Sequence, residues 1–132
     1  MMRITAFYAS LLTVLYLYFS VRVIGWRRLK RVEIRHAEDT QPLRRMRVHA
    51  NFAEYAPFAL LLMALAESLA PPHILIHLVG LTLVAGPVMH AYGLSQTPQI
   101  LKYRVWGMQL TLAAMGIAAL MCFSLSALYL LV

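Results

Sequence analysis

Charged residues and cysteine are both scarce in this 132-residue chain. Only 13% of its residues are charged, five of them acidic, and Cys122 is the single cysteine. One cysteine excludes an internal disulfide framework and any metal site built from paired cysteines. Cys122 itself is expected to be a small residue in a packed helix. The sequence also contains no phosphate-binding loop, no Ser/His/Asp set and no recognisable metal motif.

Hydrophobic residues are correspondingly abundant. They make up 61% of the chain, well above the composition of soluble domains. Apolar runs predict four membrane-spanning helices at about residues 4–26, 43–69, 74–94 and 100–130. Since backbone groups in lipid need partners within the protein, we expect an all-α, integral membrane four-helix bundle protomer in one domain, residues 1–132.

The basic residues are concentrated in two places. Ten of the twelve lysines and arginines lie within residues 27–47 or 102–104, which are alternate loops and so lie on one side of the bilayer. The positive-inside bias predicts that this side is cytoplasmic and that both termini lie on the outer side. Anionic headgroups of membrane lipids explain such a patch, so no nucleic acid partner is expected.

The second predicted span carries a polar stripe. Arg47, Asn51 and Glu54 are spaced i, i+4 and i+7, and Arg44 lies three residues earlier on the same face. An arginine or a carboxylate below the headgroups costs a few kcal/mol unless it meets a partner or a wet cavity. The stripe is therefore expected to face protein.

Two interpretations of the stripe stay open. In one, Arg47 satisfies Glu54 through Asn51 as an internal ion pair. In the other, arginines bind carboxylates of a small zwitterionic, anionic ligand and the glutamate takes its ammonium group. The ligand interpretation is favoured by other polar residues at the same depth, namely Arg22, His90, Tyr92, Arg104 and Gln109.

Other residues are assigned structural roles. His49 faces away from the stripe, which suggests an oligomer with central second helices. Glu67 is expected to be an interfacial or interhelical partner, and His73 with His77 is not expected to bind a metal without a third ligand. Small residues that permit close helix approach are Gly80, Gly86, Gly107, Thr111, Ala114, Gly116 and Ala118.

Three segments carry a family resemblance. They are Arg47-x-His-x-Asn-x-x-Glu-x-x-Pro57, His-Ala-Tyr-Gly at 90–93 and Tyr-Arg-Val-Trp-Gly at 103–107. Together they resemble the MAPEG family, membrane-associated proteins in eicosanoid and glutathione metabolism, over nearly the whole chain. The chain is most similar to small bacterial members. The resemblance implies a homotrimer in the bacterial inner membrane, with glutathione as co-substrate at the subunit interface near the cytoplasmic side.

Residue by residue, the resemblance implies that Arg47, Asn51 and Glu54 contact glutathione and that Arg104 is the catalytic group that stabilises the thiolate. Arg22 is similar to a first-helix arginine that reaches the same ligand. His90 and Tyr92 complete the predicted ligand set, and no residue is predicted to bind a metal.

Two positions depart from the family pattern. Pro87 stands where glutathione-using members usually have an arginine, and Leu94 where they have a tyrosine. The first functional hypothesis is a glutathione transferase or peroxidase acting on a hydrophobic small electrophile from the bilayer. The alternative, which the departures favour, is a non-catalytic membrane protein that binds a lipid headgroup or another anion, or whose polar stripe is structural.

Overall fold

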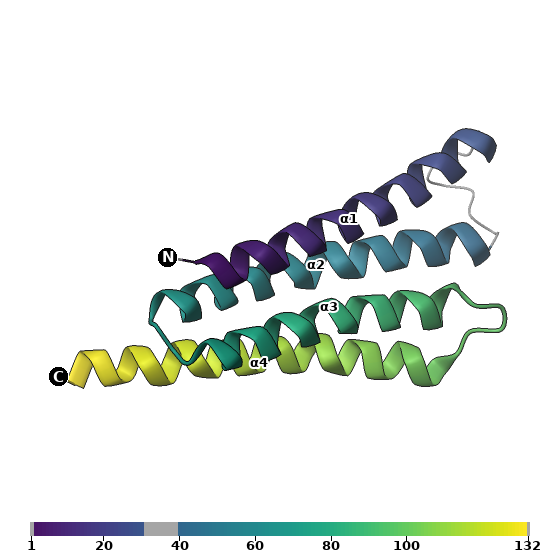
Figure 1. The fold of residues 1–132 in the computed structure, drawn as a ribbon. Coiled ribbons are helices and arrows are strands. Elements are labelled where there is room, and N and C mark those ends of the chain that lie inside the picture. Colours follow the sequence, from purple (N-terminus) through teal and green to yellow (C-terminus); the bar gives the residue numbers. More distant parts are fainter. Residues whose placement is uncertain (1, 31–39, 132) are drawn as a thin grey trace.

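The computed structural model describes residues 2–30 and 40–131, and within them it consists of four long helices without strands (Figure 1). These are α1 (Arg3–Lys30), α2 (Thr40–Ser68), α3 (His73–Ser95) and α4 (Leu101–Leu131). Each is long and apolar enough to cross a membrane. The predicted all-α, four-helix protomer is therefore confirmed.

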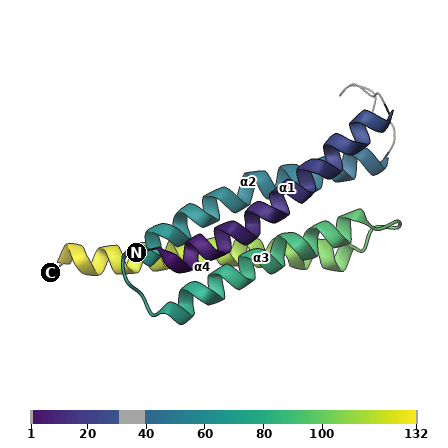
Figure 2. The same ribbon diagram turned by 45° about the horizontal axis from the view of Figure 1, so that its top comes forward.

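Consecutive helices run antiparallel, so the two ends of the bundle differ in composition (Figures 1 and 2). One end, here called the basic end, holds Arg27 and Arg28 near the end of α1, the start of α2 and the α3–α4 turn. The opposite end holds both chain termini and the α2–α3 turn. In the bundle α2 and α3 both contact the other three helices, whereas α1 and α4 lie at opposite corners.

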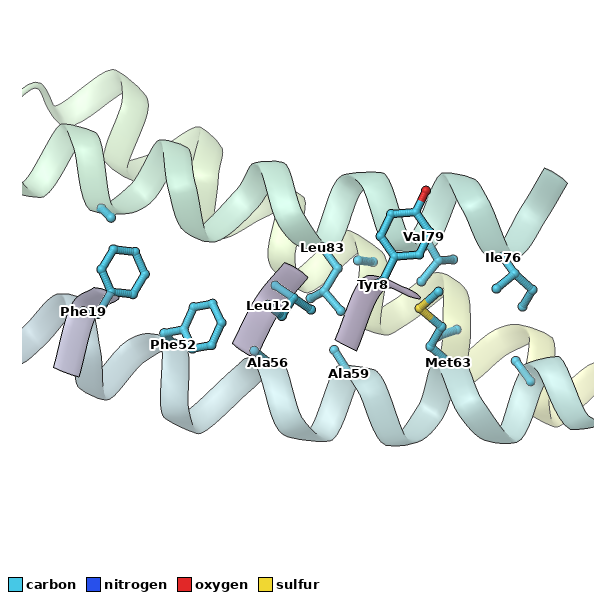
Figure 3. Close-up of a cluster of buried hydrophobic side chains, with 14 of the residues drawn as sticks. Tyr8, Leu12, Phe19, Phe52, Ala56, Ala59, Met63, Ile76, Val79 and Leu83 are labelled. Carbon is cyan, nitrogen blue, oxygen red and sulfur yellow. The ribbon is translucent and has the colours of Figure 1, made fainter. Parts of the chain in front are cut away.

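The hydrophobic core follows the middle of the bundle (Figure 3). Side chains spaced three, four or seven residues apart on each helix meet there, as expected for apolar helix faces. Their outward-facing neighbours are apolar too, including Phe7, Phe58 and Leu81, as expected for helices that cross a membrane. The labelled core residues are Tyr8, Leu12, Phe19, Phe52, Ala56, Ala59, Met63, Ile76, Val79 and Leu83.

Glycines bring the backbones of α3 and α4 into direct contact. A Cβ atom on Gly93 would lie 2.6 Å from the Arg104 nitrogen, and one on Gly86 would lie 2.9 Å from the Gly107 carbonyl oxygen. A Cβ atom on Gly107 would overlap the backbone of His90. Real Cβ contacts are longer, so any side chain at these positions forces the two helices apart. Small residues are a common means of close helix packing in membranes.

Polar side chains form hydrogen bonds between helices at the end of the bundle opposite the basic end. The Glu67 carboxylate accepts hydrogen bonds from the backbone nitrogens of Ile4 at 2.9 Å and Thr5 at 2.7 Å. It thus satisfies amides at the start of α1 that have no partner within the helix. Glu67 is an interhelical partner, as predicted. Nearby, the Tyr8 hydroxyl and His77 Nδ1 share a hydrogen bond of 3.2 Å.

The last turns of α4 reach beyond the rest of the bundle. The helix has 31 residues and its antiparallel neighbour α3 has 23, so α4 continues past the start of α3 (Figure 1). Leu130 and Leu131 are 87% and 86% exposed in the protomer. This segment remains apolar although it packs on no other helix.

Candidate functional site

A cavity of about 520 Å³ opens at the basic end between α2, α3 and α4. It brings together five of the seven predicted site residues, which come from three different helices. The complete lining is Leu43, Arg44, Arg47, Ala50, Asn51, Glu54, His90, Leu94, Gln99 and Arg104.

The α2 wall carries the polar stripe on one helical face. Asn51 contacts α4 there, because its Nδ2 donates to the sulfur of Met108 at 3.4 Å. Arg47 and Glu54 are exposed in the protomer, and among the described residues neither side chain forms a hydrogen bond or an ion pair. The structure therefore does not contain the internal ion pair considered from the sequence. Both groups are available to a ligand.

A hydrogen bond between α3 and α4 stabilises the cavity wall opposite α2. His90 is buried, and its Nδ1 lies 3.0 Å from the Arg104 carbonyl oxygen. A carbonyl can only accept, so Nδ1 must carry the proton and donate it. In the neutral ring Nε2 is then an acceptor. The close packing at Gly93 and Gly107 is what allows this bond.

The Arg104 side chain has a single protein partner within the described part of the chain. Its NH1 donates to Gln99 Oε1 at 3.2 Å, and the side chain is exposed in the protomer. A guanidinium has five N–H donors, so most of them remain for an anion in the cavity. Gln99 was not predicted from the sequence, because its position depends on how the α3–α4 turn folds back.

Arg44 connects α2 to that turn. Its NH1 donates to the Gln96 carbonyl oxygen at 2.8 Å and to Thr97 Oγ1 at 3.1 Å. Its Nε is buried and has no hydrogen-bond partner in the described structure. The sequence placed Arg44 on the stripe but not among the ligand contacts. The signal was present, since Arg44 lies one turn before Arg47 on the same face.

Arg22 and Tyr92 lie elsewhere in the protomer. They line a separate groove of about 310 Å³ between α1 and α3. Helix α3 directs His90 and Leu94 into the cavity, whereas Ala91 and Tyr92 face the groove. The structure thus does not bring these two residues to the other five, and their contact with glutathione stays a prediction.

Comparison with known proteins agrees with this architecture. The sequence model of the MAPEG family matches residues 5–124. The chain belongs to the MAPEG family. It is also similar to the inner membrane protein YecN of Escherichia coli strain K12, with 31% identity over 112 residues, 85% of this chain and 84% of the relative. YecN of Escherichia coli O6:H1 matches with the same figures.

The two departures from the family pattern occupy different places. Leu94 lines the cavity, so an apolar side chain stands in its wall. Pro87 is buried within α3 and is not part of the lining. Over residues 2–30 and 40–131, no three histidine, cysteine, aspartate or glutamate side chains gather closely enough to hold a metal ion.

Proposed function

We propose that this MAPEG protein is a glutathione-dependent transferase or peroxidase that acts on a hydrophobic electrophile from the bilayer. The observation that carries the proposal is the cavity at the basic end. Three arginines, a glutamate, an asparagine and a histidine line it within membrane-spanning helices. Charged groups at this depth are costly without a counter-charge, which a bound anion supplies.

The donors and acceptors of the cavity match the chemistry of glutathione. That tripeptide has two carboxylates, one ammonium group, two amides and a thiol. Arg44 and Arg47 suit the carboxylates, because a guanidinium binds them bidentately, and Glu54 suits the ammonium group. Asn51 suits an amide. With Arg104 included, the lining has three positive charges and one negative charge, which complements a ligand of net negative charge.

Arg104 is the proposed catalytic residue. A thiol has an ordinary pKa of about 8.5, and a guanidinium beside it lowers that pKa by favouring the anion. The thiolate sulfur then forms a bond to an electrophilic carbon, and the displaced electron pair leaves with the leaving group or is protonated on the substrate. With a hydroperoxide, the sulfur attacks oxygen and releases an alcohol. A second glutathione then forms the disulfide and water.

The open side of the cavity supports an oligomer, for which the family resemblance implies three copies. Arg47, Glu54 and Arg104 are exposed in the protomer between α2 and α4, where lipid would be a poor environment for them. A second copy that covers this face encloses the ligand. The other side of α2 is polar as well, since His49 Nε2 and Ser20 Oγ share a hydrogen bond of 3.0 Å. On that side α1 of the same protomer satisfies His49, so the proposal of central second helices rests on the exposed cavity side of α2 and on the family resemblance.

The proposed location is the inner membrane, with the basic end cytoplasmic and both termini on the outer side. The name of the YecN relatives supports the membrane, and the clustered arginines support the orientation. In this arrangement the cavity opens towards the compartment that holds glutathione, while its substrate arrives through lipid.

Ligand-dependent thermal stability tests the binding step. Glutathione should raise the apparent melting temperature of the detergent-purified protein increasingly with its concentration. At a hundredfold excess over Kd the free energy of unfolding should rise by about 2.7 kcal/mol. Arg47→Ala and Glu54→Gln should abolish the shift. Arg28→Gln is the matched control, because Arg28 is an exposed arginine at the same end but outside the cavity. No shift of the parent protein at millimolar glutathione would exclude the proposal.

The ultraviolet absorbance of the thiolate tests the catalytic role of Arg104. Bound glutathione should show thiolate absorbance at neutral pH, and Arg104→Gln should remove most of it. If the guanidinium lowers the pKa of the bound thiol by about two units, from about 8.5 to about 6.5, its removal reduces the thiolate fraction at pH 7 roughly 25-fold, from about three quarters to about 3%. S-methylglutathione should still bind the variant. A variant with unchanged absorbance would assign Arg104 to binding alone.

The second candidate function is anion binding without catalysis. Leu94 favours it, because the cavity wall has an apolar side chain where glutathione-using members have a tyrosine. Stabilisation that rises with the concentration of glutathione or other small anions and is lost in Arg47→Ala, without thiolate absorbance and without turnover of an electrophile or a hydroperoxide, would establish this alternative.

A further inference from the structure

The groove between α1 and α3 contains polar side chains, among them Arg22 and Ser95, to which the proposed function assigns no role. It is lined by two parallel stripes, Leu15, Tyr18, Phe19 and Arg22 on α1, and Val88, Ala91, Tyr92 and Ser95 on α3, with Gln96 at its end. Both stripes have the spacing i, i+3, i+4 and i+7, which places each set on one helical face. Both helices run towards the basic end, so each stripe becomes polar at the same level.

Arg22 is a half-buried cation without an anionic partner in the described structure. Its NH2 donates to Ser95 Oγ at 3.5 Å, and its guanidinium carbon lies 5.6 Å from the centre of the Tyr18 ring. Neither of the two described acidic residues lies in the groove, because Glu54 lines the cavity and Glu67 accepts hydrogen bonds at the start of α1. A charge left in this state within a spanning helix is unfavourable, and an anion would relieve it.

One part of the groove is apolar and the other is polar, which matches the acyl chain and the phosphate of a phospholipid. Leu15 lies seven residues before Arg22, about 10 Å along the helix at 1.5 Å per residue. The apolar side chains of Leu15, Phe19 and Val88 therefore lie closer to the centre of the bilayer than Arg22 does. The guanidinium of Arg22 and the hydroxyl of Ser95 lie near the headgroup level of the basic end. An acyl chain and a phosphate fit these two parts in that order.

We propose that this groove binds one anionic phospholipid of the leaflet at the basic end, with its phosphate on Arg22 and Ser95 and part of a chain along Leu15, Phe19 and Val88. Charge complementarity favours a lipid over a second copy of the chain, because an apolar helix face would leave Arg22 without a counter-charge. The groove lies between α1 and α3, whereas the open side of the cavity lies between α2 and α4, and α1 and α4 share no contact among the described residues. The proposal therefore requires neighbouring subunits to pack on faces other than the α1–α3 face. Tyr18 and Tyr92 are 56% and 53% exposed at its edges.

Lipid retention measured by native mass spectrometry tests the proposal. The detergent-purified protein should retain phosphatidylglycerol over phosphatidylcholine by about fivefold, the ratio that corresponds to about 1 kcal/mol per basic side chain at a membrane surface. Arg22→Gln should remove most of this preference. Arg28→Gln removes the same charge from the same helix outside the groove, and it should change the preference by less than about twofold. Equal losses in both variants would mean unspecific attraction and would overturn the proposal.

Photo-crosslinking of the unmodified protein gives an independent test should Arg22→Gln not fold. Phosphatidylglycerol with a photoreactive chain should label peptides from residues 15–22 and 88–96 in preference to other lipid-facing segments. Labelling spread evenly over the helices, or absent from this groove because another subunit covers it, would overturn the proposal.

Glutathione serves as the competitor that separates the groove from the cavity. Saturating glutathione should leave the retained phosphatidylglycerol unchanged, because Arg22 lines the groove and not the cavity of the protomer. Displacement of the lipid by glutathione would assign Arg22 to the thiol site and refute the lipid proposal. Failure of glutathione to bind at all would remove the proposed function and leave the lipid test intact.

Discussion

The contact between Gly107 and α3 makes a sharp prediction about stability. In Gly107→Ala the added Cβ would overlap the backbone of His90 and lie 2.6 Å from the Gly86 carbonyl oxygen. Neither neighbour can rotate away, because both are backbone. The helices must separate, and we expect the cost to fall near the upper end of the range for overpacking, about 2–3 kcal/mol.

Gly116→Ala is the matched control on the same helix. No atom lies within 4 Å of a Cβ placed at Gly116. Both variants gain the same helix propensity, about 1 kcal/mol relative to glycine, so that gain cancels when they are compared. The difference between the two variants is then the packing cost alone.

Thermal unfolding followed by far-ultraviolet circular dichroism measures this difference. At about 4 °C per kcal/mol for a chain of this size, Gly107→Ala should melt roughly 8–12 °C below Gly116→Ala. One detergent and one scan rate are needed, because membrane proteins often unfold irreversibly. Equal melting temperatures would refute the backbone contact between α3 and α4 on which the cavity geometry depends.

Two further substitutions test other contacts. Glu67→Gln replaces a carboxylate that accepts hydrogen bonds from two backbone N–H groups with an amide that has one acceptor oxygen. We expect the free energy of unfolding to fall by about 1–2 kcal/mol. The same unfolding assay measures this loss, with Ser68→Ala as the control at an exposed neighbour. Gly93→Ala pushes against the Arg104 backbone nitrogen, so it should lower glutathione-dependent stabilisation more than Gly116→Ala does, and an unchanged shift would show that Arg104 needs no support from α3.

The sequence predicted the part of the site that lies on one helix. Arg47, Asn51 and Glu54 share a face because the α-helix repeats every 3.6 residues, a local property that needs no tertiary information. The structure then confirms four helices, and it places this face on a cavity. Arg44 follows from the same periodicity, although it was left out of the predicted ligand set.

Residues grouped by depth alone were harder to place. Arg22, Tyr92, His90 and Arg104 lie at similar levels, yet the first two line the groove and the others line the cavity. Depth follows from position along a span, whereas direction depends on which helices pack side by side. The same limit applies to small residues, since Gly107 and Gly116 look alike in the sequence but only Gly107 meets a neighbouring backbone.

The overhang of α4 affects which bilayers suit this protein. From Val105 to Leu131 the apolar part of the helix is about 40 Å long at 1.5 Å per residue, whereas an average hydrocarbon core is about 30 Å thick. A tilt of about 40° would absorb the surplus, and that is the upper end of the range for membrane helices. A kink in the helix or a locally thickened bilayer would also keep Leu130 and Leu131 out of water. Through hydrophobic mismatch, the tilt of α4 should therefore depend on lipid chain length. The angle between the cavity and the headgroup layer should change with that tilt.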